Sequence, residues 1–334
     1  MRVLVTGGAG YIGSQLVHDL LVAGYDVVVV DDFSSGHPEA LRRAQALAGR
    51  RCTVYTGDVG DPTVMTQALR GVEAVFHLAA LKLVDESVRE PARYFRNNVG
   101  AMCTMLDTME SCGVRRLIYS SSAAVYGTSD VMPICEDAPL RPESPYGLTK
   151  LHGEQLLQAM ATCSGWSTVA LRYFNPVGAH PSGHIGQTLE NAAALVPRAI
   201  RAILRPQHRL TVYGVDYPTP DGTCLRDYIH ISDLSAAHIA AVGSLEEGRN
   251  HIFNVGTGRA YSVREVLDSF QRTVGREVPH VIGPRRPGDL IWSMADPKRF
   301  TATTGFTAAH DLDEMVGSAW QWCAANPEGF GARA

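Results

Sequence analysis

Tyr146 and Lys150 stand four residues apart near the start of a helical pattern, a spacing that places both side chains on one face of the helix. A phenol has a reference pKa of about 10 and is a poor base at neutral pH. A neighbouring ammonium group favours the phenolate, so Lys150 would let Tyr146 take a proton from a substrate alcohol. Ser122 follows an expected strand and carries a hydroxyl that could bond the same alcohol. Because such Tyr/Lys pairs are common on helix surfaces, the prediction depends on the motifs that accompany this one.

A glycine-rich turn lies between the first expected strand and the first expected helix. Gly7, Gly10 and Gly13 have the spacing of a tight turn that lets the backbone approach a pyrophosphate closely. The N-terminus of the following helix offers free N–H groups and the positive end of its dipole. Asp31 ends the second expected strand, where its carboxylate would bind ribose hydroxyls and repel a 2′-phosphate. The turn and the acid therefore predict NAD rather than NADP as a cofactor.

Short β-branched runs alternate with helical patterns through the first half of the chain. Expected strands cover 3–6, 26–31, 52–56, 74–77, 116–120 and 167–172, and expected helices cover 11–23, 39–47, 62–69, 91–111 and 146–162. This alternation indicates an α/β fold of the Rossmann type, a doubly wound parallel sheet covered on both faces. Ligands bind at the carboxyl ends of such strands. Asp58 and Val59, which follow the third strand, are expected at the adenine edge.

The pattern changes after Asn175, where Pro, Gly and His become frequent. Shorter helices are expected at 193–204, 232–245, 263–274 and 312–324, and strands are expected near 227–231 and 252–255. We expect an NAD-binding Rossmann domain over residues 1–176 with a return segment at 228–256. A smaller α/β substrate-binding domain would take residues 177–227 and 257–334.

Composition excludes several classes of protein. The 334 residues carry 30 basic and 34 acidic side chains, a net charge of −4 without a dense basic run, so no nucleic-acid partner is expected. No apolar stretch approaches the roughly 18 residues of a membrane span, and the first residues lack a secretory signal pattern. Seven scattered cysteines argue against both a disulfide framework and a zinc site. We expect a cytoplasmic protein with no metal, in which His180, His184 and His230 are loop or core residues.

Longer segments resemble the extended short-chain dehydrogenase/reductase superfamily: Thr6–Ser14, His77–Lys82, Asn97–Val99, Ser120–Gly127 and Ser144–Lys150. Others resemble its UDP-galactose 4-epimerases specifically: Leu171–Gly183, Asp216–Thr223, Arg226–His230, Pro284–Leu290 and Leu312–Met315. The similarity runs from residue 1 to about 330. The resemblance implies tightly held NAD and epimerisation of a UDP-hexose at C4 through a transient 4-keto sugar. Tyr146 would be the base, with Ser122 and Lys150 supporting its phenolate.

Matching positions imply the residues of both binding sites. Those implied at the cofactor are Gly7, Gly10, Tyr11, Ile12, Gly13, Asp31, Asp32, Asp58, Val59, Leu78, Ala79, Lys82, Asn97, Ser122, Tyr146, Lys150 and Tyr173. Those implied at the UDP-hexose are Asn175, Leu195, Tyr213, Arg226, Arg286, Asp289 and Ser293. Relatives often carry Asn where this chain has Ala194, so an amide contact with the substrate is expected to be missing.

The resemblance also bears on substrate range and assembly. A tyrosine at the position of Ser293 would fill the space near C2 of the sugar, so a serine there predicts that UDP-N-acetylhexosamines are accepted as well. Alternatively, Trp292 or Met294 fills that space. A homodimer is implied through the helices around 97–110 and 147–160.

Two other functions stay open. A nucleotide-sugar dehydratase or decarboxylase of the same superfamily would need a carboxylate just after the catalytic serine, where this chain has Ala123 and Ala124. A non-catalytic NAD-binding regulator could use the same fold, because fold alone does not imply function. Such a regulator would have no need to keep Tyr146, Lys150 and Ser122 together. A serine hydrolase is disfavoured because the chain has no Gly-x-Ser-x-Gly motif.

Overall fold

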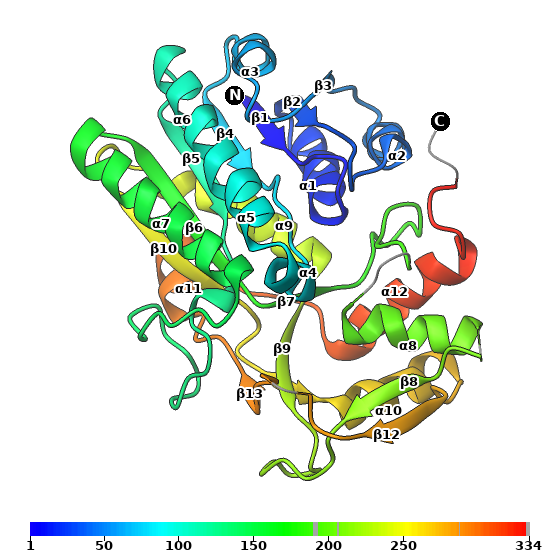
Figure 1. The fold of residues 1–334 in the computed structure, drawn as a ribbon. Helices are drawn as coiled ribbons and strands as arrows, with labels where there is room; N and C mark the ends of the chain where they lie inside the picture. The colour runs from blue at the N-terminus through cyan, green and yellow to red at the C-terminus, as the bar shows by residue number, and fades with distance from the viewer. Residues whose placement is uncertain (190–192, 206, 287, 332–334) are drawn as a thin grey trace.

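The computed structural model describes residues 1–189, 193–205, 207–286 and 288–331. In this part of the chain, seven parallel strands form one sheet in the order β10-β6-β5-β4-β1-β2-β3 (Figure 1). The strands are β1 (Arg2–Thr6), β2 (Asp26–Asp31), β3 (Thr53–Thr56), β4 (Ala74–His77), β5 (Arg116–Ser120), β6 (Ser167–Tyr173) and β10 (Asn250–Val255). The order reverses at β1, between β2 and β4. Ligands bind at such a switch point in α/β sheets, and the predicted Rossmann-type fold is confirmed.

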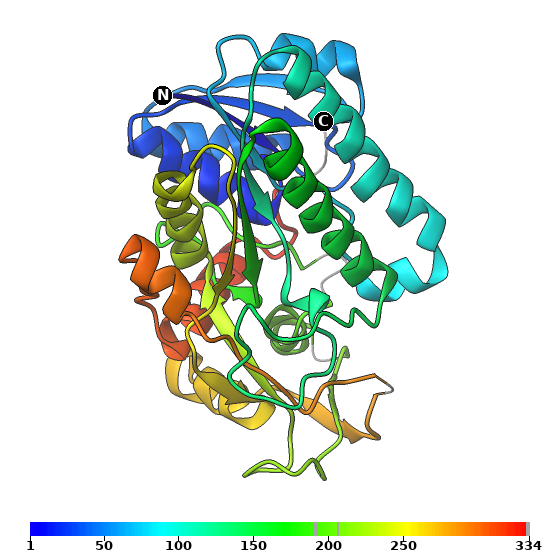
Figure 2. The same ribbon diagram turned by 90° about the vertical axis from the view of Figure 1, so that its left-hand side faces the viewer.

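Helices cover both faces of this sheet, as Figure 2 shows. On one face lie α1 (Tyr11–Val22) and α9 (Ile231–Ala240), and on the other lie α3 (Pro62–Ala68), α6 (Ala101–Ser111) and α7 (Pro145–Ser164). Alternation along β1 explains the two cores, since Val3 and Val5 pack on the α1 side and Leu4 packs on the α6 side. α2 (Pro38–Ala48) packs against α1. The central strands β1, β2 and β4 are buried on both faces and are mostly apolar, whereas β3 at the edge of the sheet is largely exposed.

The helix expected at 91–111 is present, and it contains a π-helical turn. α5 (Pro91–Phe95) leads into a π-helical turn at Arg96–Gly100 before α6 begins. Asn98 in this turn is buried, and its amide exchanges hydrogen bonds of 2.8 and 2.9 Å with the backbone of Leu81. The wider turn thus anchors the loop after β4. Insertions of this kind are frequent at functional sites.

Most of the remaining described chain forms a smaller second part beside the carboxyl edge of the sheet (Figure 1). Its strands are β7 (Asn175–Val177), β8 (Leu210–Tyr213), β9 (Leu225–His230), β11 (Ala260–Ser262), β12 (His280–Gly283) and β13 (Trp292–Ser293). α8 (Leu195–Leu204), α10 (Val263–Val274) and α12 (Leu312–Ala325) bury a core of their own around Phe270 and Trp322. α4 (Val84–Arg89) and α11 (Lys298–Thr304), which were not expected from the sequence, pack on the first part, against α7 and β10.

The segment expected to return to the first domain divides between the two parts. β9 pairs with β7, β11 and β13 in the second sheet. α9 then packs against α1, and β10 pairs in parallel with β6 at the edge of the first sheet. The division at residues 176, 228 and 256 stays a prediction, and residues 332–334 of its last segment lie outside the described chain. Within the described residues, no helix has the length and apolar character to cross a membrane.

The first turn of α8 can be tested by substitution. Ala194 is the N-cap of α8 in extended conformation, and among the described residues no side chain caps this end. Ala194→Asn supplies an acceptor for the free N–H groups of the first turn and should raise the free energy of unfolding by about 1 kcal/mol. Urea unfolding measures this value. Ser262→Ala, which removes the cap of α10, is the matched control and should lower stability by a similar amount. An unchanged midpoint in Ala194→Asn would contradict the capping account.

Candidate active site

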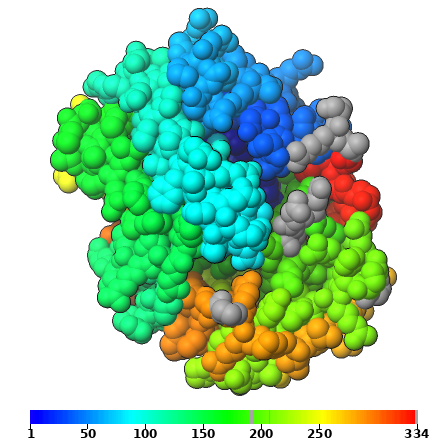
Figure 3. Space-filling view, in the orientation of Figure 1, coloured from blue at the N-terminus to red at the C-terminus, as the bar shows by residue number. Residues whose placement is uncertain are grey.

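A cleft runs along the carboxyl edge of the sheet at the switch point between β1 and β4. Figure 3 shows the surface hollowed between the blue and cyan N-terminal part and the green and orange C-terminal part. The residues implied at a cofactor line this cleft together, with the exception of Ser122. They are Gly7, Gly10, Tyr11, Ile12, Gly13, Asp31, Asp32, Asp58, Val59, Leu78, Ala79, Lys82, Asn97, Tyr146, Lys150 and Tyr173. Sequence segments far apart in the chain therefore meet in one place.

The glycine turn after β1 is packed too closely for side chains. A Cβ at Gly13 would lie 2.1 Å from the carbonyl oxygen of Gly7, and a Cβ at Gly7 would lie 2.8 Å from the amide nitrogen of Ala79. Gly7 also has a φ of 71°, in the left-handed region that favours glycine. The amides of Gly7 and Gly10 donate within the protein, to Val30 and Gly7. The first turn of α1, which lines the cleft at Tyr11–Gly13, is therefore the part that would offer N–H groups to a pyrophosphate.

Asp31 lies at the end of β2, where the adenosine ribose would bind. Its Oδ2 accepts the N–H of Ala9 and its Oδ1 accepts the N–H of Phe33, both at 2.8 Å. Burial raises the pKa of this carboxyl group, and the two backbone hydrogen bonds oppose the rise. A carboxylate oxygen accepts more than one hydrogen bond, so Asp31 can still accept from ribose hydroxyls. The residues of this cleft fit a dinucleotide with an unphosphorylated ribose.

Sequence reasoning missed several residues that line the same cleft. They are Val30, Ser34, Ser35, Gly36, Gly57, Ala80 and Leu81. For Gly36, the available signal in the sequence was its position soon after the acid at the end of β2. The structure explains the glycine, because a Cβ there would lie 2.9 Å from Oδ1 of Asp31. Ala80 and Leu81 lie in the loop after β4 that Asn98 anchors.

Tyr146, Lys150 and Ser122 meet at one end of the cleft. α7 starts with Ser144 as its N-cap and Pro145 in its first turn, which brings Tyr146 and Lys150 onto its buried face. The Nζ of Lys150 donates to the carbonyl oxygen of Ser120 at 2.8 Å and lies 6.0 Å from the centre of the Tyr146 ring. Ser122 hydrogen-bonds the Tyr146 phenol. Tyr146 and Lys150 lie more than 20 positions after Ser122 in the sequence. The fold brings both next to the end of β5.

The electrostatics of this group follow from burial. Burial raises the pKa of Tyr146, and the hydrogen bond with Ser122 lowers it. Burial lowers the pKa of Lys150 to about 7, while the negative charge of Glu154 raises it. Lys150 is thus close to losing its proton at neutral pH, so neighbouring charges decide its state. A tyrosine placed beside such an ammonium group can act as a general acid–base catalyst.

Five of the residues implied at the substrate gather around β8, β9, β13 and the loop before β13. Arg226 on β9 donates to Oδ1 of Asp289 at 2.8 Å, and Nη2 of Arg286 lies 3.5 Å from the same oxygen. The Arg286 guanidinium lies 5.7 Å from the centre of the Tyr213 ring. Ser293 on β13 stands opposite Arg226 in register. Two guanidinium groups beside an aromatic ring offer a diphosphate and a base the partners that they need.

The other two implied residues lie further along the second part. Asn175 follows the cleft residue Tyr173 by two positions, and its Nδ2 donates to the carbonyl oxygen of Asp227 at 2.7 Å. This bond places it next to Arg226, between the cleft and the arginine cluster. Leu195 begins α8 and packs against the core of the second part.

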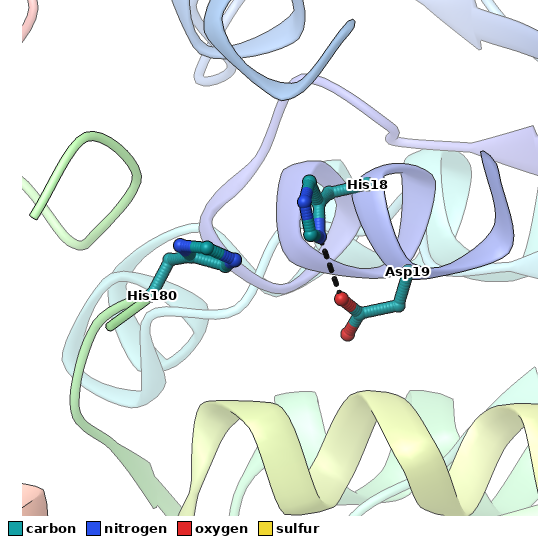
Figure 4. Close-up of side chains that lie close together, drawn as sticks. All are labelled: His18, Asp19 and His180. Carbon is teal, nitrogen blue, oxygen red and sulfur yellow. Dashed lines mark hydrogen bonds and ion pairs between the residues drawn. The ribbon is translucent and has the colours of Figure 1, made fainter. Parts of the chain in front are cut away.

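Away from the cleft, His18, Asp19 and His180 place potential metal-ligand atoms within 4.8 Å of one another (Figure 4). Nδ1 of His18 lies 2.7 Å from Oδ1 of Asp19. Nδ1 of His180 accepts the backbone N–H of Ser182 at 3.1 Å, so the neutral ring carries its hydrogen on the other nitrogen. A histidine that binds a metal through Nε2 needs the opposite arrangement, in which Nδ1 carries the hydrogen and donates it. This group is better explained as a polar contact between α1 and the loop after β7.

The chain matches known proteins over nearly its whole length. The NAD dependent epimerase/dehydratase family matches residues 3–256. The UDP-glucose 4-epimerase of Bacillus subtilis (strain 168) is 42% identical, with 99% of each chain covered. The structure of UDP-glucose 4-epimerase from Bifidobacterium longum in complex with NAD⁺ and UDP has a TM-score of 0.92 at 39% identity, covering 98% of this chain and 100% of that one. UDP-N-acetylglucosamine 4-epimerase from Methanobrevibacter ruminantium M1 has a TM-score of 0.84 at 30% identity, covering 97% and 98%. The chain therefore belongs to the NAD dependent epimerase/dehydratase family, among its UDP-glucose 4-epimerases.

Proposed function

We propose that this protein interconverts UDP-galactose and UDP-glucose by inverting C4 of the hexose, with NAD bound in the cleft. The observation that carries the proposal is the meeting of Tyr146, Lys150 and Ser122 at the end of a dinucleotide cleft. Tyr173 and Asn175 connect that cleft to the cluster around Arg226 and Asp289. A UDP-hexose bound with its diphosphate at the arginines would direct its sugar toward Tyr146.

The residues of the cleft divide the chemistry between them. Tyr146 would take the proton of the 4-hydroxyl group and return it after the 4-keto sugar has turned its other face, with the Ser122 hydroxyl bonded to the same oxygen. Lys150 would stabilise the phenolate by its positive charge. Bound NAD supplies a hydride acceptor and donor at C4, so the reaction needs no added oxidant. Asp31 and the turn at Gly7–Gly13 would hold the dinucleotide.

The dehydratase and decarboxylase alternatives remain less favoured. Ala123 and Ala124 form a short 3-10 helix directly after Ser122, so the position that would need a carboxylate holds methyl groups. The regulator alternative gives no reason for the contact of Ser122 with Tyr146.

We also propose a homodimer in the cytoplasm. The apolar stripe Met102, Met105, Leu106 and Met109 is buried within the chain, so the interface proposed on α6 and α7 would have to use outward residues such as Cys103 and Leu148, which are exposed. All seven cysteines are free thiols, the state that a reducing compartment maintains.

The proposed function predicts that the purified protein carries NAD and converts UDP-galactose without added cofactor. NAD is regenerated in each turnover and has no need to leave the cleft. Denaturing the protein and assaying the supernatant for nicotinamide nucleotides measures the cofactor, and product analysis measures the conversion. Release of NADP alone, or dependence on added NADPH, would contradict the role given to Asp31.

Tyr146→Phe removes one oxygen atom and keeps the ring. The loss of a general acid–base group lowers kcat by about 10²–10⁴, and we expect circular dichroism to show an unchanged fold. Tyr94→Phe, which removes a buried hydroxyl bonded to Leu83 and Glu86, is the control and should keep kcat near that of the wild type. A near-normal rate in Tyr146→Phe would identify another group as the base.

Ser293 should decide whether N-acetylated sugars enter. It is buried on β13 opposite Arg226, and a tyrosine there would occupy the space that an acetamido group needs. Overpacking a rigid site costs about 1–3 kcal/mol, so Ser293→Tyr should lower kcat/KM for UDP-N-acetylgalactosamine about 5- to 150-fold and leave UDP-galactose little changed. Wild-type protein without N-acetyl activity, or a tyrosine variant that retains it, would refute the assignment.

A further inference from the structure

A fully buried ion pair lies behind the three residues of the active site. Glu154 on α7 and Arg172 on β6 are 2% and 1% exposed. Nε and Nη2 of Arg172 donate to Oε1 and Oε2 of Glu154 at 2.9 and 2.6 Å, a two-pronged arrangement. Burying two charges carries a large desolvation cost, and apolar side chains of the same size are often as stable. Stability alone therefore gives little reason for a charged pair at this place.

Glu154 contacts the strand end that carries Ser122. The hydroxyl of Ser121 donates to Oε1 of Glu154. Ser121 stands between Ser120, whose carbonyl oxygen accepts from Lys150 at 2.8 Å, and Ser122, which bonds the Tyr146 phenol. One carboxylate thus fixes the residue that links both partners of the catalytic group.

The carboxylate is itself held from the opposite side. Nη1 of Arg172 donates to the Tyr126 hydroxyl at 2.9 Å and to the carbonyl oxygen of Glu136 at 3.1 Å. The Tyr126 hydroxyl in turn donates to Oδ1 of Asn254 at 2.7 Å. Arg172 therefore has little freedom to move, and neither has Glu154.

Glu154 is also the nearby negative charge for Lys150, one helical turn away. Facing Lys150 are Tyr146 on the same helix, Tyr119 on β5, with its ring centre 4.9 Å from Nζ, and His77 on β4. Burial raises the pKa values of Tyr119 and of the adjoining Tyr173 on β6 and lowers that of His77 to about 3, so these three are uncharged at neutral pH. Among these described neighbours, Glu154 is the group that opposes loss of the Lys150 proton.

We propose that Glu154 is a positioning residue for the reaction: through Ser121 it fixes the turn that carries Ser122, and it places a carboxylate one helical turn from Lys150. The proposal rests on the proposed function, because Tyr146 needs the Lys150 ammonium only if it acts as a base. Arg172 holds the carboxylate in this place.

The charge of Lys150 can be measured without catalysis. Lys82, Lys150 and Lys298 are the only lysines in the chain, so protein labelled with ¹³C at the lysine Cε gives three NMR signals, assigned by Lys82→Arg and Lys298→Arg. Loss of a neighbouring charge shifts a pKa by about one unit or more. An opposite charge nearby favours the ammonium form of a lysine and so raises its pKa. Glu154→Gln removes that charge and should move the Lys150 titration midpoint about one pH unit lower in the holoenzyme.

Three further variants separate charge from folding. Glu154→Gln/Arg172→Gln leaves no unpaired buried charge and covers the case in which Glu154→Gln alone does not fold. Its Lys150 midpoint should move in the same direction but less far, because the positive charge of Arg172 is removed with the carboxylate. Glu154→Asp keeps the charge and should restore the midpoint toward that of the wild type. Asp313→Asn breaks another two-pronged arginine pair, with Arg272 on α10, and should leave Lys150 unchanged.

The pH dependence of kcat for UDP-galactose gives the second measurement. The alkaline limb should move to lower pH in Glu154→Gln and recover in Glu154→Asp, while Ser121→Ala should lower kcat several-fold without moving that limb. Unmoved titration and pH profile in the Gln variants would overturn the proposal and leave a structural pair. If wild-type protein interconverts no UDP-hexose, the proposed function fails, and the Lys150 titration still decides whether Glu154 sets its charge.

Discussion

The carboxyl ends of parallel strands must lie along one edge of a sheet, and this constraint assembles the site. β1, β2 and β4 each end in a residue or loop that lines the cleft, through Gly7, Asp31 and Leu78, and β5 leads to Ser122 beside the cleft residue Tyr146. The strand order reverses at β1, so the connections from β1 and β4 leave toward opposite faces and open a space between them. No single segment of the chain could build the site, because each side of the cleft is formed by residues that follow a different strand.

Burial at this edge makes the pKa values of its side chains sensitive to neighbouring charges. Lys150 is 3% exposed and Tyr146 is 8% exposed, so water screens their charges poorly. The same burial that makes a phenol harder to ionise also makes an ammonium group easier to deprotonate. The protonation of each group therefore depends on its neighbours. Ser122 opposes the rise in the pKa of Tyr146, and Glu154 opposes the fall in the pKa of Lys150. The chemistry of the cleft thus rests on a few contacts at the end of β5.

The two parts of the molecule are joined close to the cleft. The Tyr11 hydroxyl at the start of α1 donates to the carbonyl oxygen of Gly178 at 2.7 Å. Further out, Arg43 of α2 lies over the rings of Trp322 and Phe330 and donates to Asn326. These contacts hold the arginine cluster of the second part in a fixed relation to the dinucleotide turn, and so they govern how a substrate bound at Arg226 meets Tyr146.

Local patterns in the sequence were sufficient for the fold class, the glycine turn, Asp31 and the Tyr146–Lys150 pair, because each depends on spacing within one strand, turn or helix. Three features depended on tertiary structure. The π turn at Arg96–Gly100 exists because Asn98 bonds Leu81 across the fold. β9 reads as a strand in sequence, yet only pairing decides that it joins the second sheet and not the first. Glu154 looks like an ordinary helix acid four residues after Lys150, and its role appears only when β6 brings Arg172 and β5 brings Ser121 to it. Sequence spacing fixes which side chains share a face, whereas contacts between distant segments depend on how the elements pack.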